Sequence, residues 1–200
     1  LLRTVFDARA ILVGENFRFG CARAGDITTL ADLGFSTRPL PAVTWRGIVV
    51  SSSEIRKRVE AGDVSKAARL LGRCYAITGD IVTGHGIGSK QTVPTLNLRT
   101  QAEVLPASGV YITRTTDPST GRHWNSITNI GVRPTFANEG GLSIETFLLS
   151  PFDGAPPAAI TLQFLRRVRE ERKFDSPEAL KSQILRDVTT AQTYFRRLNW

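Results

Sequence analysis

The sequence of 200 residues predicts an α+β chain: an α/β segment first, then a small antiparallel barrel or sandwich, then a closing helix. Three patterns support this order. An apolar run leads through polar turns into helical periodicity, several short alternating segments follow with no helix between them, and an apolar stripe of helical period ends the chain. Because the pattern changes near residue 72, we expect two domains, 1–72 and 73–200.

The first domain opens with a continuous apolar run at 10–14, which is typical of a buried parallel strand. A second strand-like run covers 47–50. The serines at 51–53 precede apolar residues spaced four apart, so they are candidates for a helix N-cap. Asp63 can cap a second helix, and we expect that helix to end at Gly72, because glycine readily adopts the left-handed conformation that closes a helix.

The second domain consists mainly of short strands, with turn residues between the alternating or β-branched segments. The strands are expected at 75–83, 110–116, 126–132, 143–149 and 159–168.

A helix is expected to close the chain. Ser176 is its expected N-cap, and Pro177 suits the first helical position. The apolar stripe of this helix comprises Leu180, Ile184, Val188, Ala191, Phe195 and Leu198.

Lysine and arginine outnumber aspartate and glutamate by 26 to 18, which gives a net charge of +8. This excess favours anionic partners, either nucleic acid or a phosphorylated small molecule. No apolar stretch reaches the roughly 18–20 residues of a membrane span, and no leader opens the sequence, so we expect a cytoplasmic protein without membrane contact. The two cysteines and two histidines lack the spacing of a disulfide framework or a zinc site. The absence of methionine, even at position 1, indicates a fragment cut upstream of Leu1.

A glycine-rich segment follows the first expected strand of the second domain. Gly84, Gly86 and Gly88 alternate with other residues, and Lys90 comes shortly after them. Such glycines let the backbone approach a phosphate closely, and the lysine adds a positive charge. The segment is not a Walker A loop, which needs glycine directly before lysine. A mobile hairpin turn explains the glycines equally well.

Thr95 and Asn97 follow Pro94 in a segment that reads as extended. On a strand these two side chains point to the same side, about 6–7 Å apart. A hydroxyl and an amide oxygen so placed suit Mg²⁺ that also contacts substrate phosphates. The alternative is a polar strand edge that faces solvent.

Glu145 lies in a segment of period two that places it on the same face as Phe147 and Leu149. Desolvating a carboxylate among apolar neighbours is costly without a partner, which makes Glu145 a candidate general base. The alternative is a carboxylate at a barrel rim that faces water.

These residues together resemble one family, the bacterial bifunctional riboflavin kinase/FAD synthetase. The resemblance covers about 73–200, and its motifs occur in the family's order. Besides the glycine-rich segment they are Pro94-Thr95-Leu96-Asn97, Gly109-Val110-Tyr111, the run from Asn129 to Phe136, Glu145-Thr146-Phe147-Leu148, and Val168-Arg169 with Lys173-Phe174.

The resemblance implies a six-stranded Greek-key barrel with a terminal helix, which transfers the γ-phosphoryl group of ATP to the 5′-hydroxyl of riboflavin and forms FMN. It implies that Thr95 and Asn97 bind Mg²⁺ and that Glu145 is the catalytic base. The glycines at 84–88 would contact ATP phosphates, and Arg169 lies in the segment that closes over the flavin. The sequence departs from the family at Ser89, where arginine is usual, and Lys90 would supply that charge. It also departs at 92–93, where glycine-phenylalanine is usual, and at Leu96, where alanine is usual.

The upstream segment resembles the end of the family's adenylyltransferase domain, which is similar to the Rossmann fold. The matching residues are Asn16, within Gly14-Glu15-Asn16-Phe17-Arg18-Phe19-Gly20, and Ser51, Ser52, Ser53 and Arg56. The HxGH motif on which adenylyl transfer relies does not occur in this sequence. We therefore expect FAD formation in the intact parent but not in this chain.

Riboflavin or FMN and ATP are thus the expected partners, with no nucleic acid, and the sequence predicts no particular oligomeric state. The alternative is a basic β-barrel that binds nucleic acid, supported by the net charge and by the basic run at 166–173. Exposed aromatic side chains that could stack on bases would favour that alternative. Tyr111, Phe147 and Phe164 are instead expected in strand interiors.

Overall fold

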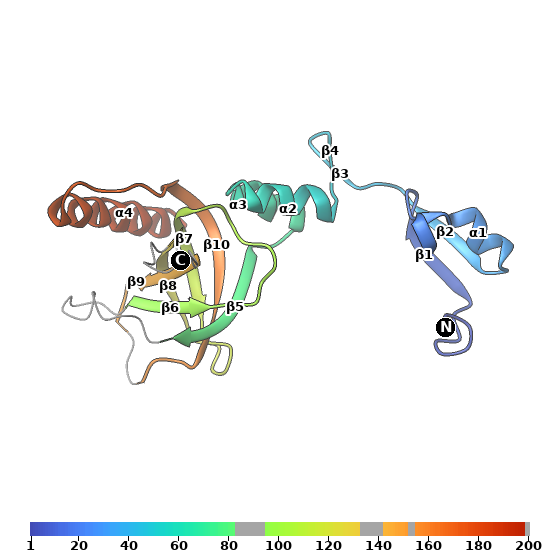
Figure 1. Cartoon of the computed structure of the whole chain (residues 1–200), viewed down its shortest axis with the longest axis horizontal. Coiled ribbons are helices and arrows are strands. Elements are labelled where there is room, and N and C mark those ends of the chain that lie inside the picture. The colour runs from blue at the N-terminus through green and yellow to red at the C-terminus, as the bar shows by residue number, and fades with distance from the viewer. Residues whose placement is uncertain (83–94, 133–141, 152–154, 199–200) are drawn as a thin grey trace. The chain divides into compact units, whose positions relative to one another are not determined.

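The computed structural model describes residues 1–82, 95–132, 142–151 and 155–198, and Figure 1 shows the elements that they form. The chain divides into two compact units, Leu1–Val50 and Ser51–Trp200. Each unit is described by itself. Among the described residues, no helix is both long enough and apolar enough to cross a membrane.

The first unit contains a β-α-β arrangement. Strand β1 (Ala10–Gly14) pairs in parallel with β2 (Ser36–Leu40), and the 3-10 turn η1 (Cys21–Arg23) and helix α1 (Ile27–Asp32) connect them. Asp26 caps α1, because its carboxylate accepts a hydrogen bond from the Thr29 amide at 3.0 Å. The predicted strand at 10–14 is present.

The predicted burial of that strand was wrong. Leu12 is 60% exposed, and Leu30 is the buried apolar residue among those described in this unit. A sheet of two strands offers little area to cover, so it cannot enclose an apolar run on both faces. The run at 47–50 forms part of an antiparallel hairpin of β3 (Thr44–Trp45) and β4 (Ile48–Val49). Arg46 and Gly47 both have positive φ, which matches a tight hairpin turn.

Two helices open the second unit, and their ends agree with the sequence analysis. Ser51 caps α2 (Ser52–Glu60), its hydroxyl accepting from the Glu54 amide at 3.2 Å. Asp63 caps α3 (Val64–Leu71), which ends at Gly72 in the left-handed conformation with φ of 74°. Local capping chemistry therefore sets where α2 and α3 begin and where α3 ends.

Six antiparallel strands form a closed barrel in the order β10-β5-β6-β9-β8-β7. Strands β7, β8 and β9 form a meander; β6 pairs with β9, and β10 closes the barrel between β7 and β5. This order confirms the expected six-stranded Greek-key barrel. The strands are β5 (Tyr75–Val82), β6 (Thr95–Arg99), β7 (Gly109–Thr116), β8 (His123–Val132), β9 (Leu142–Leu148) and β10 (Ala159–Glu170).

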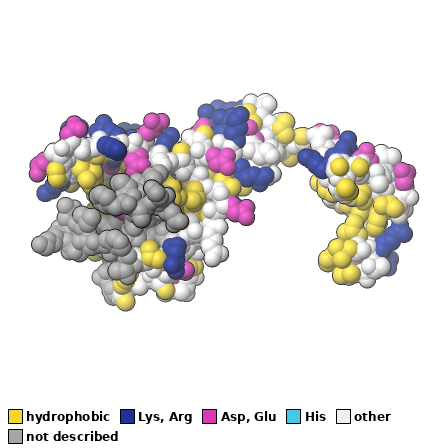
Figure 2. Space-filling view, in the orientation of Figure 1, with side chains coloured by type: hydrophobic (Ala, Val, Ile, Leu, Met, Phe, Trp, Pro, Cys, Tyr) yellow, Lys and Arg dark blue, Asp and Glu magenta, His cyan; other side chains and the backbone are white. Residues whose placement is uncertain are grey.

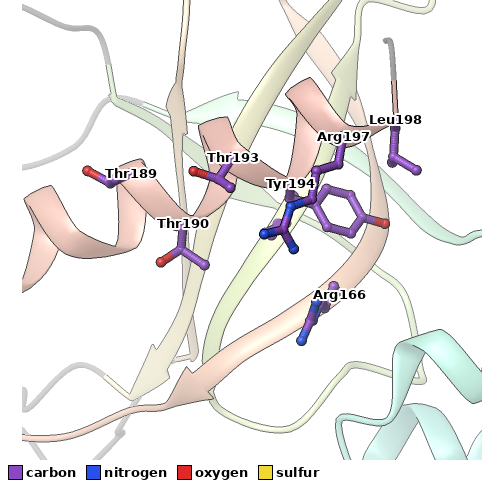
Figure 3. Close-up of a pocket in the computed structure, with 8 residues that line it drawn as sticks. Arg166, Thr189, Thr190, Thr193, Tyr194, Arg197 and Leu198 are labelled. Carbon is purple, nitrogen blue, oxygen red and sulfur yellow. The ribbon is translucent and has the colours of Figure 1, made fainter.

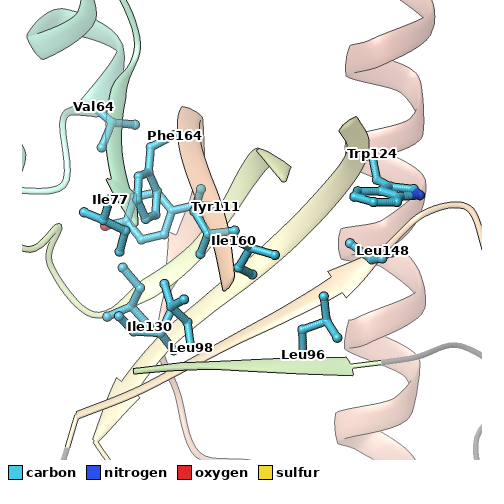
Figure 4. Close-up of a cluster of buried hydrophobic side chains, with 12 residues drawn as sticks. Val64, Ile77, Leu96, Leu98, Tyr111, Trp124, Ile130, Leu148, Ile160 and Phe164 are labelled. Carbon is cyan, nitrogen blue, oxygen red and sulfur yellow. The ribbon is translucent and has the colours of Figure 1, made fainter. Parts of the chain in front are cut away.

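The interior of the barrel is packed rather than hollow. Figure 4 shows the apolar side chains that fill it, including Ile77, Leu98, Tyr111 and Phe164. The Tyr111 and Phe164 rings meet edge to face, with centroids 5.4 Å apart. Because the interior is filled, a substrate of this barrel must bind on its outer surface or at its rim.

Buried hydroxyl groups form a second part of the interior. Thr113 hydrogen-bonds to Ser126 at 2.8 Å and to Thr128 at 2.7 Å, and Thr128 bonds to Thr146 at 2.9 Å. These bonds run from β7 across β8 to β9. They satisfy polar groups that would be costly to bury alone, and they fix the register of the three strands.

Helix α4 (Pro177–Arg197) covers part of the outer surface. The Ser176 hydroxyl accepts from the Ala179 amide at 3.1 Å, and Pro177 is the first helical residue, as expected. Ala191 and Phe195 are buried against an outer cluster of Val110, Ile112 and Ile127.

The predicted apolar stripe lies on α4, but only part of it is covered. Leu180 and Ile184 in its first half are 42% and 40% exposed, and Leu198 at its end is 40% exposed. The helical period predicts which side chains share a face, but the reach of the barrel beneath decides how many of them are covered.

Helix α3 packs on the barrel within the second unit. Val64 is fully buried in the same cluster as the barrel core, and the Ser65 hydroxyl donates to the Leu165 carbonyl at 3.0 Å. The expected domain boundary near residue 72 stays a prediction. The compact unit that holds the barrel begins earlier, at Ser51.

Candidate active site

The outer face of the barrel carries a row of polar side chains on three adjacent strands. Asn97 of β6 pairs with Glu145 of β9, and Glu145 pairs on its other side with Asn129 of β8. Residues directly opposite in antiparallel strands point to the same face, with Cβ atoms about 4.5–5.5 Å apart. Leu96 and Ile144 belong to the interior cluster, so their neighbours Asn97 and Glu145 face outward.

Thr95 shares the outward face of β6 with Asn97, about 6–7 Å along the strand. Thr95 is exposed and pairs with Phe147, whereas Asn97 is half-buried. The strand thus presents a hydroxyl and an amide oxygen together, with the Glu145 carboxylate across from the amide. Hard oxygen groups of this kind fit a Mg²⁺ ion that also contacts phosphates. In the described ranges, no three residues among His, Cys, Asp and Glu gather as a metal cluster.

Glu145 has a specific polar neighbour on its own strand. The Ser143 hydroxyl donates to Glu145 Oε1 at 2.8 Å, and Ser143 itself is buried. This bond orients the carboxylate. Phe147 and Leu149, which strand alternation places on the same face, pack against the outer cluster that includes Ala191 of α4. The carboxylate therefore lies at the border between a covered apolar surface and the polar row.

The glycine-rich segment cannot be compared with its prediction. Gly84, Gly86, Gly88 and Lys90 lie outside the described residues. The strand position before this segment is known, however, because Val82 pairs with Asn97. The chain thus leaves β5 beside the Thr95–Asn97 pair.

Arg169 of β10 occupies a nearby position on the same face, since Val110 pairs with both Asn129 and Arg169. Its guanidinium donates to Asp187 Oδ2 of α4 from Nε at 2.9 Å and from Nη2 at 2.8 Å. The Phe174 ring lies 5.6 Å from the guanidinium carbon. In this structure Arg169 of β10 therefore forms an ion pair with α4. The predicted contact between Arg169 and the flavin stays a prediction.

The residues assigned to an adenylyltransferase remnant are divided between the two units. Asn16 belongs to Leu1–Val50, whereas Ser51, Ser52, Ser53 and Arg56 belong to the other unit. Two of the three serines have helical roles: Ser51 caps α2, and Ser52 accepts from Arg56 Nη2 at 3.4 Å. Their predicted role in nucleotide binding stays a prediction.

Sequence reasoning named Asn129 only as part of a family motif, and it assigned no role to Asn129 or Ser143. Their outward orientation follows from the strand alternation, so a period-two pattern could have placed each of them on a face. Their proximity to Glu145 has different origins. Ser143 is two residues away on the same strand, whereas Asn129 is near only because β8 pairs with β9.

A carboxylate beside side chains with neutral oxygen atoms, on the outside of a filled barrel, is an arrangement that phosphoryl transfer can use. Comparison with known proteins agrees with this class of reaction. The family model "Flavokinase: Riboflavin kinase" matches residues 71–195, and the chain belongs to the riboflavin kinase family.

Curated relatives share the similarity over most of this chain. "Bifunctional riboflavin kinase/FMN adenylyltransferase" of Pseudomonas fluorescens is 35% identical over 184 residues, which cover 90% of this chain and 58% of the relative. The protein of the same name from Escherichia coli (strain K12) is 31% identical over 189 residues, which cover 92% of this chain and 60% of the relative. The chain thus spans somewhat more than half the length of these relatives.

A solved structure supports the fold. The "Crystal Structure of Macrolide-efflux Protein from Streptococcus pneumoniae" superimposes with a TM-score of 0.81 at 24% sequence identity. The match covers 93% of this chain and 60% of that chain. At this identity the likeness bears on the fold alone.

Proposed function

We propose that this chain is an ATP-dependent riboflavin kinase, which transfers the γ-phosphoryl group of ATP to the riboflavin 5′-hydroxyl and releases FMN and ADP. The single observation that carries the proposal is the pairing of Glu145 with Asn97 on the outer face of the barrel. Family membership supplies the substrate class. The packed interior supports a reaction on the outer surface.

Glu145 acts as the general base. Its carboxylate accepts the proton of the 5′-hydroxyl as that oxygen bonds to the γ-phosphorus and the bond to the ADP oxygen breaks. Ser143 holds one carboxylate oxygen at 2.8 Å, which reduces the number of orientations that the base can adopt. Positioning of this kind is the main contribution that a protein makes to phosphoryl transfer.

Thr95 and Asn97 are the proposed ligands of Mg²⁺. The ion, when bound, neutralises charge on the phosphate oxygens. On this chain's side, the two oxygen-bearing side chains are held at a fixed spacing because both belong to β6, whose neighbours on both sides are paired strands. The glycines at 84–88 and Lys90 are the proposed contacts of the ATP phosphates, and Arg169 belongs to the proposed flavin segment.

The chain is proposed to make FMN but not FAD. Adenylylation is part of the printed name of the relatives, and we assign it to the intact parent. The HxGH motif does not occur in these 200 residues. Asn16, Ser51, Ser52, Ser53 and Arg56 are the proposed remnant of that second site, and we place the kinase reaction in the cytoplasm.

The alternative function is binding of nucleic acid by a basic barrel. Tyr111 and Phe164 are fully buried, and Phe147 packs under α4, so these rings are unavailable for stacking on bases. On the face shown in Figure 2, lysine and arginine side chains are interspersed with aspartate and glutamate. Both observations favour the small-molecule enzyme.

One assay tests the proposal. The purified chain is incubated with riboflavin, ATP and Mg²⁺, and FMN and FAD are separated by chromatography. We expect FMN to accumulate without FAD. Absence of FMN, together with oligonucleotide binding that weakens as salt is raised, would support the alternative instead.

A further inference from the structure

A cavity of about 450 Å³ lies between the C-terminal half of α4 and the outer surface of strands β7 and β10 (Figure 3). Most of its lining comes from α4, with Ile112 contributed by β7 and Arg166 by β10. None of the lining residues belongs to the proposed kinase site, whose row lies on β6, β9 and β8. The cavity is therefore a separate feature of the same unit. Its volume is in the range typical of small-molecule sites, about 300–1,000 Å³.

Two guanidinium groups face this cavity. Figure 3 shows Arg197 projecting from the end of α4 and Arg166 from the strand below, both on the same side of the helix. No aspartate or glutamate is among the lining residues. Within the part of the chain that the structure describes, the ion pairs involve other residues. Two like charges at one concave surface, without a counter-charge in its lining, favour a bound anion.

Neutral donors accompany the charges. The Thr193 hydroxyl accepts a hydrogen bond from Arg196 Nη2 at 3.1 Å, so its own proton remains available to a ligand. Burial, followed by the neighbouring Cys74, raises the pKa of Tyr194, and the charge of Arg166 opposes this effect only in part. The Tyr194 hydroxyl therefore stays protonated at neutral pH.

The Thr189 and Thr190 hydroxyls, which also line the cavity, already donate to backbone carbonyls of α4. The donors that remain for the acceptor oxygens of a phosphate group are the two guanidinium groups and the Thr193 and Tyr194 hydroxyls.

The lining also has an apolar part. The Tyr194 ring, Ile112 and Leu198 form this part of the cavity. An aromatic ring beside such a wall buries area and can stack on tyrosine. Inorganic phosphate would leave this part unused.

We propose that the cavity is a second, non-catalytic binding site for a ligand that joins a phosphate group to a flat heteroaromatic ring. The arginines and the Thr193 hydroxyl bind the phosphate, and the Tyr194 ring and Ile112 contact the heteroaromatic ring. Nucleotides and FMN share this chemistry, and both classes occur among the substrates and products of the proposed kinase reaction. The site itself does not require that reaction.

Titrations followed by backbone amide NMR test the proposal. ADP, FMN and pyrophosphate are added separately to the full chain, and the resonances of residues 189–198 are monitored. We expect ADP or FMN to shift the Thr190 and Tyr194 resonances with an affinity at least tenfold above that of pyrophosphate. Whichever of ADP and FMN binds more tightly shows whether the site prefers a nucleotide base or a flavin ring. Equal affinity for pyrophosphate would overturn the proposal.

Variants separate this site from general charge effects and from the kinase site. Arg166→Gln combined with Arg197→Gln should weaken the binding at least tenfold, with a dispersed spectrum showing that the fold is retained. Arg186→Gln is the matched control, because Arg186 is exposed on the same helix about 16 Å along the axis from Arg197. Asn97→Ala should leave the α4 shifts unchanged. Equal loss in the control, or loss in Asn97→Ala, would contradict a separate site.

Discussion

Asn97 and Glu145 stand directly opposite each other on strands β6 and β9, with both side chains on the outer face of the barrel. This pairing places an amide and a carboxylate side by side although they are far apart in the sequence. A second pairing places Asn129 on the other side of the same carboxylate. These three positions allow the proposed mechanism to be tested one function at a time.

Removal of the negative charge at Glu145 should affect the chemical step most. Glu145→Gln is expected to lower kcat for FMN formation by at least about 10²-fold, the scale of losing a general base. Riboflavin affinity, measured by fluorescence quenching, should change little. Glu170→Gln is the control, because Glu170 is an exposed carboxylate on β10. Full activity in Glu145→Gln would remove the assignment of Glu145 as base.

Replacement of Asn97 should affect the metal rather than the flavin. Asn97→Ala is expected to raise the Mg²⁺ concentration needed for half-maximal activity about tenfold or more, because an oxygen ligand is lost. Asn125→Ala, a change to an asparagine of β8 that pairs outside this row, should leave the Mg²⁺ dependence unaltered. If Asn97→Ala weakens the response to Mg²⁺ and the affinity for flavin equally, the variant is unfolded rather than impaired in metal binding.

A second carboxylate next to Glu145 should shift the pH dependence. Asn129→Asp places a second carboxylate opposite Glu145, and repulsion between the two charges disfavours the state in which both are ionised. The acid limb of the kcat profile should therefore move to higher pH, and activity should recover as pH rises. Asn125→Asp adds the same charge at a different position and should leave the limb in place. An unmoved profile for Asn129→Asp would show that this position does not influence the base.

The ion pair between Arg169 and Asp187 should contribute to stability. The Asp187 side chain is 5% exposed and also accepts from Gln183 Nε2 at 2.8 Å. Asp187→Ala leaves Arg169 without this partner and should lower the free energy of unfolding by about 2–4 kcal/mol, less than a fully buried pair because Arg169 keeps some solvent contact. Urea denaturation without flavin measures this effect. Asp175→Ala, at an exposed position, is the control, and a comparable loss there would contradict the role of the pair.

The helices before the barrel should stabilise it. Val64, Ala67 and Leu70 of α3 are buried, with Val64 in the barrel cluster. A chain that begins at Ser51 should therefore unfold at the same urea concentration as the barrel of the full chain. A chain that begins at Arg73 should unfold at a lower urea concentration, because it loses the apolar contacts that Val64 makes with the barrel core. Equal midpoints for the two chains would show that the barrel is independent of α3.

Much of the fold could be predicted because its signals are local. A period of two is a property of neighbouring residues, so the strands of the barrel are found close to their predicted bounds. Capping depends on one side chain and one amide a few residues away, which is why Ser51, Asp63 and Ser176 begin helices as expected. Strand β2 was not predicted, because its sequence is polar, contains Pro39 and carries no alternating signal.

The amino-acid sequence by itself determined the order of the barrel strands and the closing helix, the shared side of Thr95 and Asn97, and the resemblance to a flavin kinase. Only the tertiary structure decided that β6 pairs with β9, and hence that Asn97 and Glu145 meet with Asn129 beyond them. It also decided that just half of the apolar stripe on α4 is covered. The physical reason is that alternation specifies a face within one strand, whereas neighbours across strands are chosen by the closure of the whole barrel.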